Sequence, residues 1–134
     1  MANEAVLKIE THIPINFTCS TTVTIEKGAI VKMTDPMTAV LSDGANDIVA
    51  GIVQSEKLAA DTTQNSVAIF RGGVFRVTVS SSVSAGDPVV TQGNPNVVIL
   101  ASTNNENILG VMLEDGTEGQ NKLMELRPTT MDLN

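Results

Sequence analysis

The sequence predicts an all-β fold, a small β-barrel-like domain of many short strands with an internal repeat and an extended N-terminal segment. Three observations lead to this prediction. Apolar and polar residues alternate with a period of two in most segments, as the two faces of a strand require. Turns rich in Gly, Asn, Asp and Pro separate short apolar runs. No window of ten or more residues shows a convincing helical period.

Length and composition restrict the classes of protein. The 134 residues suit one domain, and the single Cys19 cannot form an intramolecular disulfide. The net charge of −7, without a Lys/Arg cluster and without Trp or Tyr, disfavours direct nucleic-acid binding. No apolar run approaches the roughly 20 residues of a membrane span, and the N-terminus does not read as a signal peptide. We therefore expect a domain over residues 15–134 that binds neither nucleic acid nor membrane, preceded by an arm over residues 1–14.

The N-terminal region alternates from Leu7 to Ile25, which is too long for one ordinary strand. Pro14 cannot donate to a strand ladder and marks a break. We therefore predict an extended arm followed by a first core strand over residues 15–25. An apolar arm can add a strand to the sheet edge of a partner, so the candidate partner-contact residues are Ile9, Ile13, Ile15 and Phe17. The alternative is that this stretch forms the protein's own first strand, and from Phe17 onward that alternative is favoured.

Further strands are predicted over residues 29–33, 38–41, 48–54, 66–71, 74–79, 88–91, 96–100, 108–113 and 122–127. Gly28 and Gly86 lie in turns that precede strands. Gly72 and Gly73 stand between two strands, and paired glycines tolerate the positive φ angles of a type I′ turn. We therefore predict a two-residue hairpin at this point.

An internal repeat covers most of the chain. QNSVAIFR (64–71) matches QNKLMELR (120–127) at an offset of 56, and KGAIVKMTDP (27–36) matches AGDPVVTQGN (85–94) at an offset of 58. DIVAGIVQSE (47–56) matches ENILGVMLED (106–115) at an offset of 59, with Gly51 on Gly110. Three blocks in nearly constant register favour two similar β-units, about 22–71 and 80–127, around a pseudo-twofold axis. The alternative is chance similarity among β-rich segments. Glycine inside an apolar strand marks a bulge or a close backbone approach, which we expect at Gly51 and Gly110.

No residue pattern indicates catalysis. His12 is the single histidine, and Cys19 lies on the apolar phase, where a thiol is normally buried and inert. The acidic turns at 43–47 and 114–116 carry oxygen ligands that suit calcium, but Asp, Asn and Gly are also the common turn residues, and we favour the turn interpretation. Arg71 and Arg127 recur at equivalent ends and are expected to pair with acidic loops or to cap a sheet edge. We expect no catalytic residue, no metal and no cofactor.

The ordered phrases GAIVKMTDP (28–36), IVAGIVQSEKLAADTTQNSVAIFRGGVFRV (48–77), SAGDPV (84–89) and ENILGVMLEDGTEGQNKLMELRP (106–128) resemble the small head-decoration, or capsid-cement, proteins of tailed bacteriophages. The resemblance implies a β-tulip fold, a homotrimer, and a place on the outer surface of the virion capsid. It also implies that the major capsid protein is the partner and that the protein is made in the cytoplasm of the host bacterium. The family has no catalytic motif, and residues 7–17 do not align with it.

Two other functions are compatible with the fold class. One is a small-molecule or carbohydrate-binding β-module without catalysis, with the polar loop 101–107 as a possible wall, although only Phe17, Phe70 and Phe75 supply aromatic surface. The other is a trimeric nucleotide-hydrolysing β-enzyme, which is disfavoured because the chain has no tyrosine to stack on a base and no phosphate-binding motif.

Overall fold

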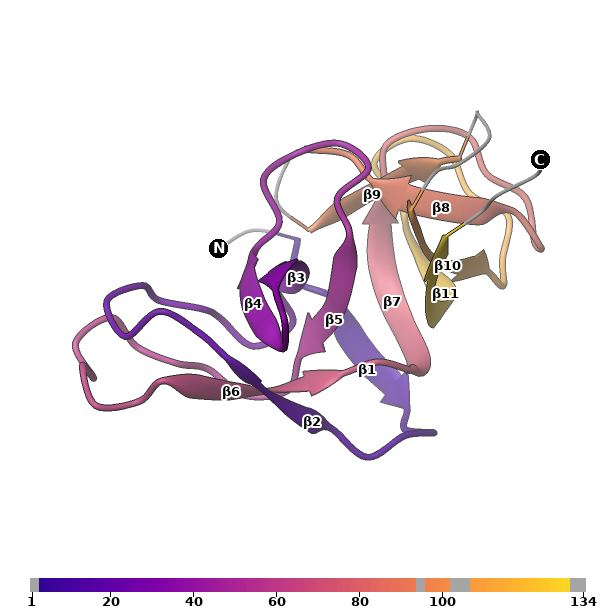
Figure 1. The fold of residues 1–134 in the computed structure, drawn as a ribbon. Coiled ribbons are helices and arrows are strands. Elements are labelled where there is room, and N and C mark those ends of the chain that lie inside the picture. The colour runs from indigo at the N-terminus through magenta and orange to yellow at the C-terminus, as the bar shows by residue number, and fades with distance from the viewer. Residues whose placement is uncertain (1–2, 94–95, 102–106, 131–134) are drawn as a thin grey trace.

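Short strands separated by turns make up the chain. The computed structural model describes residues 3–93, 96–101 and 107–130, and all regular structure in these ranges is β-strand (Figure 1). The all-β prediction is confirmed, and most predicted strands lie within one or two residues of the observed ones. The strands are β1 Val6–Ile9, β2 Ile15–Thr18, β3 Ile30–Asp35, β4 Thr38–Leu41, β5 Val49–Val53, β6 Ser66–Phe70, β7 Gly73–Val79, β8 Pro88–Thr91, β9 Val97–Leu100, β10 Asn107–Met112 and β11 Asn121–Thr130.

The strands form two closed rings of five (Figure 1). Barrel 1 has the order β2-β4-β3-β5-β6, and barrel 2 has the order β7-β9-β8-β10-β11, with β1 added to the outer side of β7. In each ring the first strand in chain order, β2 or β7, pairs antiparallel with the last, β6 or β11. It also pairs parallel with the third strand in chain order, β4 or β9. The internal repeat therefore holds at the level of strand order. It also begins earlier than residues 22 and 80, because β2 and β7 are equivalent.

The strand registers correct one detail of the repeat. The Cys19 amide donates to the Asn65 carbonyl in barrel 1, and the Val79 amide donates to the Gln120 carbonyl at the equivalent place in barrel 2. Asn65 therefore corresponds to Gln120, one residue earlier than the sequence alignment of the two octets suggests. A one-residue shift exchanges the two faces of a strand, so Arg71 and Arg127 are not equivalent.

The predicted long strand over residues 15–25 is wrong, because β2 ends at Thr18. The apolar phase is nevertheless kept in part, since Cys19 and Ile25 are buried, whereas Val23 is exposed. Ile25 exchanges two backbone hydrogen bonds with Lys57, each 2.8 Å long, in an isolated bridge. A loop anchored in this way buries alternate residues without a continuous ladder, so alternation alone does not establish a strand.

The predicted hairpin at Gly72-Gly73 is also wrong. β6 pairs with β2 and β5, and β7 pairs with β1, β9 and β11. The two glycines instead form the covalent link between the barrels. Both lie against the N-terminal segment: a Cβ on Gly72 would collide with the ring of His12, and a Cβ on Gly73 would come within 3.2 Å of the Ile9 carbonyl oxygen.

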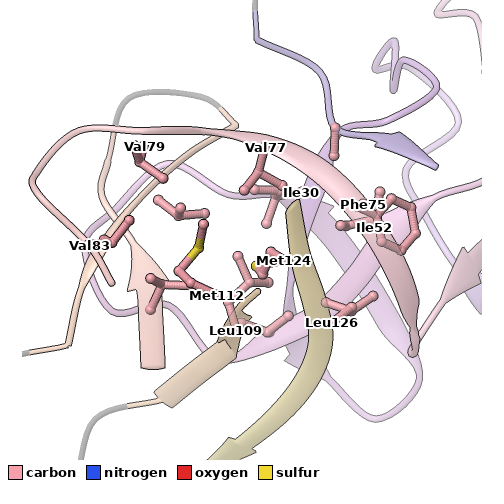
Figure 2. Close-up of a cluster of buried hydrophobic side chains, with 14 of the residues drawn as sticks. Ile30, Ile52, Phe75, Val77, Val79, Val83, Leu109, Met112, Met124 and Leu126 are labelled. Carbon is pink, nitrogen blue, oxygen red and sulfur yellow. The ribbon is translucent and has the colours of Figure 1, made fainter. Parts of the chain in front are cut away.

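The barrels share part of their hydrophobic core. One buried cluster fills barrel 1 around Phe17, Val31 and Ile69. The larger cluster fills barrel 2 and also contains barrel 1 residues, among them Ile30 and Ile52 (Figure 2). Phe70 from β6 and Phe75 from β7 meet edge-to-face, with ring centroids 5.8 Å apart. Burial of these side chains stabilises the contact between barrels as well as each barrel.

Polar contacts join the barrels at a second place, where the loop between β4 and β5 crosses to barrel 2. The Thr91 hydroxyl accepts a hydrogen bond from the Asp47 amide (2.8 Å) and donates one to the Gly44 carbonyl (2.9 Å). The Asn96 side-chain oxygen accepts a bond of 2.9 Å from the Ile30 amide. Thr91 and Asn96 are buried, so these bonds satisfy groups that water does not reach.

Glycine is required at positions 51 and 110 for the same structural reason. A Cβ on Gly51 would collide with the Phe70 carbonyl oxygen, and a Cβ on Gly110 would collide with the Glu125 carbonyl oxygen. At equivalent places in the two barrels, the neighbouring strand thus approaches too closely for any side chain, as the position of these glycines within apolar strands predicted.

Candidate partner-binding surface

The N-terminal segment is bound to barrel 2 rather than extended away from it. β1 pairs with β7 through Val6–Arg76, Leu7–Phe75 and Ile9–Val74, and the Ala5 amide donates a 2.8 Å hydrogen bond to the Gly28 carbonyl. The part of the predicted arm over residues 6–9 is therefore an edge strand of this protein's own sheet.

The four predicted contact residues have different environments. Ile13 is 86% exposed, and Ile9 and Ile15 are also exposed, so their side chains are available to a partner. Phe17 is only 2% exposed and packs inside barrel 1, opposite Val67. Phe17 is therefore a core residue and not a contact residue, in agreement with the alternative interpretation of this stretch.

A groove lies where β1 crosses the junction of the barrels, and we call it the junction groove. It has a volume of about 620 Å³. Its walls include the apolar residues Leu7, Val53, Phe70 and Phe75 and the polar residues Lys27 and Gln54. No local pattern in the sequence predicts this groove, because its walls come from four distant segments. A mostly apolar concavity with a few polar groups suits a small ligand or an inserted apolar side chain.

A second surface is the outward side of four strands of barrel 2, and we call it the outer face. In register across β1, β7, β11 and β10, its eight residues form two rows, Val6–Arg76–Leu123–Leu113 and Ile9–Val74–Glu125–Val111. Val6, Ile9 and Leu113 are exposed, and the other five are partly exposed. Six of these eight residues are apolar. The signal in the sequence was that residues 108–113 are apolar in both phases, which a strand with one solvated face does not require.

Lys57 and Cys19 lie near each other inside barrel 1. Lys57 is 0% exposed, and its Nζ donates to the carbonyls of Thr21 (2.6 Å) and Leu58 (3.0 Å). Burial raises the pKa of the Cys19 thiol, and the positive charge of Lys57 opposes that rise to a smaller extent. The ammonium group joins two loops, and the thiol is buried, as its apolar phase predicted.

The acidic loop at 43–47 is a hydrogen-bonded turn. Asp47 Oδ2 accepts bonds from the Ser42 hydroxyl (2.8 Å) and from the amides of Asp43 (3.2 Å) and Gly44 (3.1 Å). Lys32 Nζ pairs with Asp43 Oδ1 at 2.6 Å, and this hydrogen bond lowers the pKa of Asp43. No group of three or more His, Cys, Asp or Glu residues within the described ranges is arranged to hold a metal ion.

The two arginines predicted to be equivalent, Arg71 and Arg127, make different contacts. Arg71 Nη1 donates to the Ala50 carbonyl (2.8 Å), whereas Arg127 pairs with Glu125 on its own strand (3.0 Å). The two arginines thus do different things in the two barrels. In the loop 101–107, residues 102–106 lie outside the described residues. No helix in the described ranges has the length and apolar character to cross a membrane.

Comparison with known proteins gives one informative result. No known protein family and no curated protein matches the sequence. Among solved structures, the N base of the head fiber protein gp8.5 of bacteriophage phi29 is similar, with a TM-score of 0.54 and 14% sequence identity. The match covers 91% of this chain and 98% of the phage chain. The two proteins therefore share a fold over nearly their whole length.

Proposed function

We propose that this protein is a structural component of a phage virion that binds the outer surface of the assembled head and stabilises it by bridging major capsid protein subunits. The observation that carries the proposal is the fold shared, over nearly the full length of both chains, with the base of a phage head fiber. The resemblance of residues 28–128 to head-decoration proteins points to the same particle. Assembly on the virion takes place after synthesis in the host cytoplasm.

The physics of such a role requires shape and rigidity rather than reactive groups. A protein that binds the assembled lattice, and not separate subunits, stabilises the lattice by mass action. A homotrimer with one contact on each neighbouring capsid subunit gains effective concentration from linked binding events. The shared core and the Thr91 contacts make each chain a stiff unit for this purpose. The proposal needs no catalysis and no cofactor.

The contact residues that we propose for the shell lie in the N-terminal segment. Ile13 is almost fully exposed, and Ile9 and Ile15 flank it with exposed apolar side chains. The exposed ring of His12 lies against Gly72, which places the neighbouring Ile13 at the barrel link. An apolar side chain held at a fixed point and free of intramolecular burial is suited to fill a pocket on a partner.

The test uses heads purified without this protein, to which the pure protein is added back. We expect the wild type to bind, and Ile13→Ser to bind at least about tenfold more weakly, the effect of losing about 1.4 kcal/mol of contact energy. Val23→Ser is the matched control, because Val23 is exposed on a different loop. Failure of the wild type to bind such heads would refute the proposal.

The junction groove supports one alternative, a small-molecule or carbohydrate-binding module. Two of the three phenylalanines, Phe70 and Phe75, border this groove, and each is at most 3% exposed. A thermal-shift screen with sugars and nucleotides tests the alternative. A ligand that raises the unfolding midpoint of the wild type, and does so less for Leu7→Asn, would favour it over the structural role.

A further inference from the structure

We propose that the outer face of barrel 2 is the surface on which another copy of this chain packs. The proposal rests on the homotrimer of the proposed function and adds the surface that holds the copies together. Its evidence comes from the eight residues of the outer face, their counterparts in barrel 1, and the charge of the whole chain.

The internal repeat supplies a comparison within one molecule. Matching backbone hydrogen bonds, from Cys19 to Asn65 in barrel 1 and from Val79 to Gln120 in barrel 2, place Arg76 of β7 at the position of Asn16 of β2 and Leu123 of β11 at the position of Ala68 of β6. Asn16 is exposed, and Ala68 is small and partly exposed. The barrel fold itself therefore does not require a large apolar side chain at the position of Leu123. Covering by another protein surface explains Leu123 and the exposed apolar residues beside it.

Charge identifies the occupant as a second copy. The chain carries a net charge of −7, yet the outer face has one Arg76 and one Glu125, and Arg127 at its margin pairs with Glu125. Two copies of an acidic protein repel each other least when they meet through the region without excess negative charge. A basic partner would instead be attracted to the acidic remainder of the surface. Apolar residues with an arginine are also the composition typical of interface centres.

Contact through the face is favoured over sheet extension through the edge. β1 is the terminal strand of its sheet, and no other strand of the described residues pairs with its outer edge. It is only four residues long, and its register shifts between Leu7 and Ile9, with Lys8 as the extra residue. Short length, a bulge and a lysine are the features by which edge strands resist pairing with other chains.

The test replaces two apolar residues of the outer face by smaller polar ones, in the double variant Val74→Asn/Leu123→Ser. Sedimentation velocity of the wild type should show an oligomer, and the double variant should sediment as a 14.1 kDa monomer with an unchanged far-UV circular dichroism spectrum. The control Val23→Thr/Leu58→Ser changes two exposed apolar residues of barrel 1 and should leave the oligomer intact. If the double variant does not fold, Arg76→Glu provides the second test, because it gives the face two carboxylates and keeps the apolar side chains. It should weaken the oligomer most at low salt.

The outcomes separate this inference from the proposed function when head binding is measured in parallel. A wild type that sediments as a monomer at every concentration, or folded outer-face variants that remain oligomeric, would overturn the inference even if the protein binds heads. An oligomeric wild type and a monomeric variant would support the inference even if neither binds heads, and would refute only the proposed function.

Discussion

At the scale of single residues, Lys57 is unusual because an ammonium group is rarely fully buried. Its Nζ is held by two carbonyl oxygens, those of Thr21 and Leu58, which belong to segments that are not strands. Hydrogen bonds to a charged donor are stronger than neutral ones and offset part of the cost of dehydrating the charge. Lys57 therefore links these two loops by hydrogen bonds to their backbone, as ladder hydrogen bonds link neighbouring strands.

Replacement of Lys57 by methionine should destabilise the fold. The methionine side chain fills a similar volume but leaves the Thr21 and Leu58 carbonyls without this donor, which costs about 1–3 kcal/mol for a buried group. Urea unfolding followed by circular dichroism measures the change. Lys27→Met, at an exposed lysine, should change the free energy of unfolding by less than about 0.5 kcal/mol. Equal midpoints for Lys57→Met and the wild type would contradict this assignment.

Cys19 predicts a pH dependence at the alkaline end. Because burial raises the pKa of this thiol above its ordinary 9.0, the unfolded chain releases the proton at a lower pH than the folded chain does. The thiol therefore has no effect on stability below the unfolded pKa and reduces stability as the pH rises through it. Urea midpoints measured from neutral to alkaline pH should fall more steeply for the wild type than for Cys19→Val. Parallel curves would show that the thiol ionises equally in both states.

At the scale of elements, the sequence predicted where strands occur far better than how they pair. β4 and β8 were predicted to the residue, because turn-forming residues flank them. The pairing predicted at Gly72-Gly73 is wrong: the two glycines have the composition of a hairpin turn, but the strands on either side of them close two separate rings. The docking of β1 on β7 was also missed, because period-two alternation does not name the partner strand. The outer face needed the registers of four strands, which no local pattern contains.

The loop between β4 and β5 gives a prediction at this scale. Thr91→Val keeps the shape of the side chain but removes the hydroxyl that binds the Asp47 amide and the Gly44 carbonyl. We expect a loss of about 1–3 kcal/mol in stability and faster hydrogen exchange of the Asp47 amide. Thr78→Val removes a hydroxyl that bonds to Asn121 at a solvent-exposed site and should cost much less. Unchanged exchange at Asp47 in Thr91→Val would show that the loop is held by other contacts.

At the scale of the whole molecule, the shared core predicts that the barrels unfold together. Ile52 belongs to β5 of barrel 1 but packs in the cluster that fills barrel 2 (Figure 2). Truncation to alanine should cost about 2–5 kcal/mol and should lower hydrogen-exchange protection in β10 and β11 as well as in barrel 1. Ile48→Ala, at an exposed isoleucine just before β5, should change little. Loss of protection confined to barrel 1 would show that the barrels are independent units.

The pairing of β1 with β7 has a consequence for synthesis on the ribosome. Residues 6–9 leave the exit tunnel before their partner strand, which begins at residue 73. At about 5–20 residues per second, the nascent chain carries this segment without its partner for roughly 3–13 seconds. Barrel 1 has all its strands before that time, whereas Ile30 and Ile52 remain uncovered until translation of barrel 2 is complete. The nascent chain thus depends on barrel 2 to cover surfaces of segments that are synthesised before it.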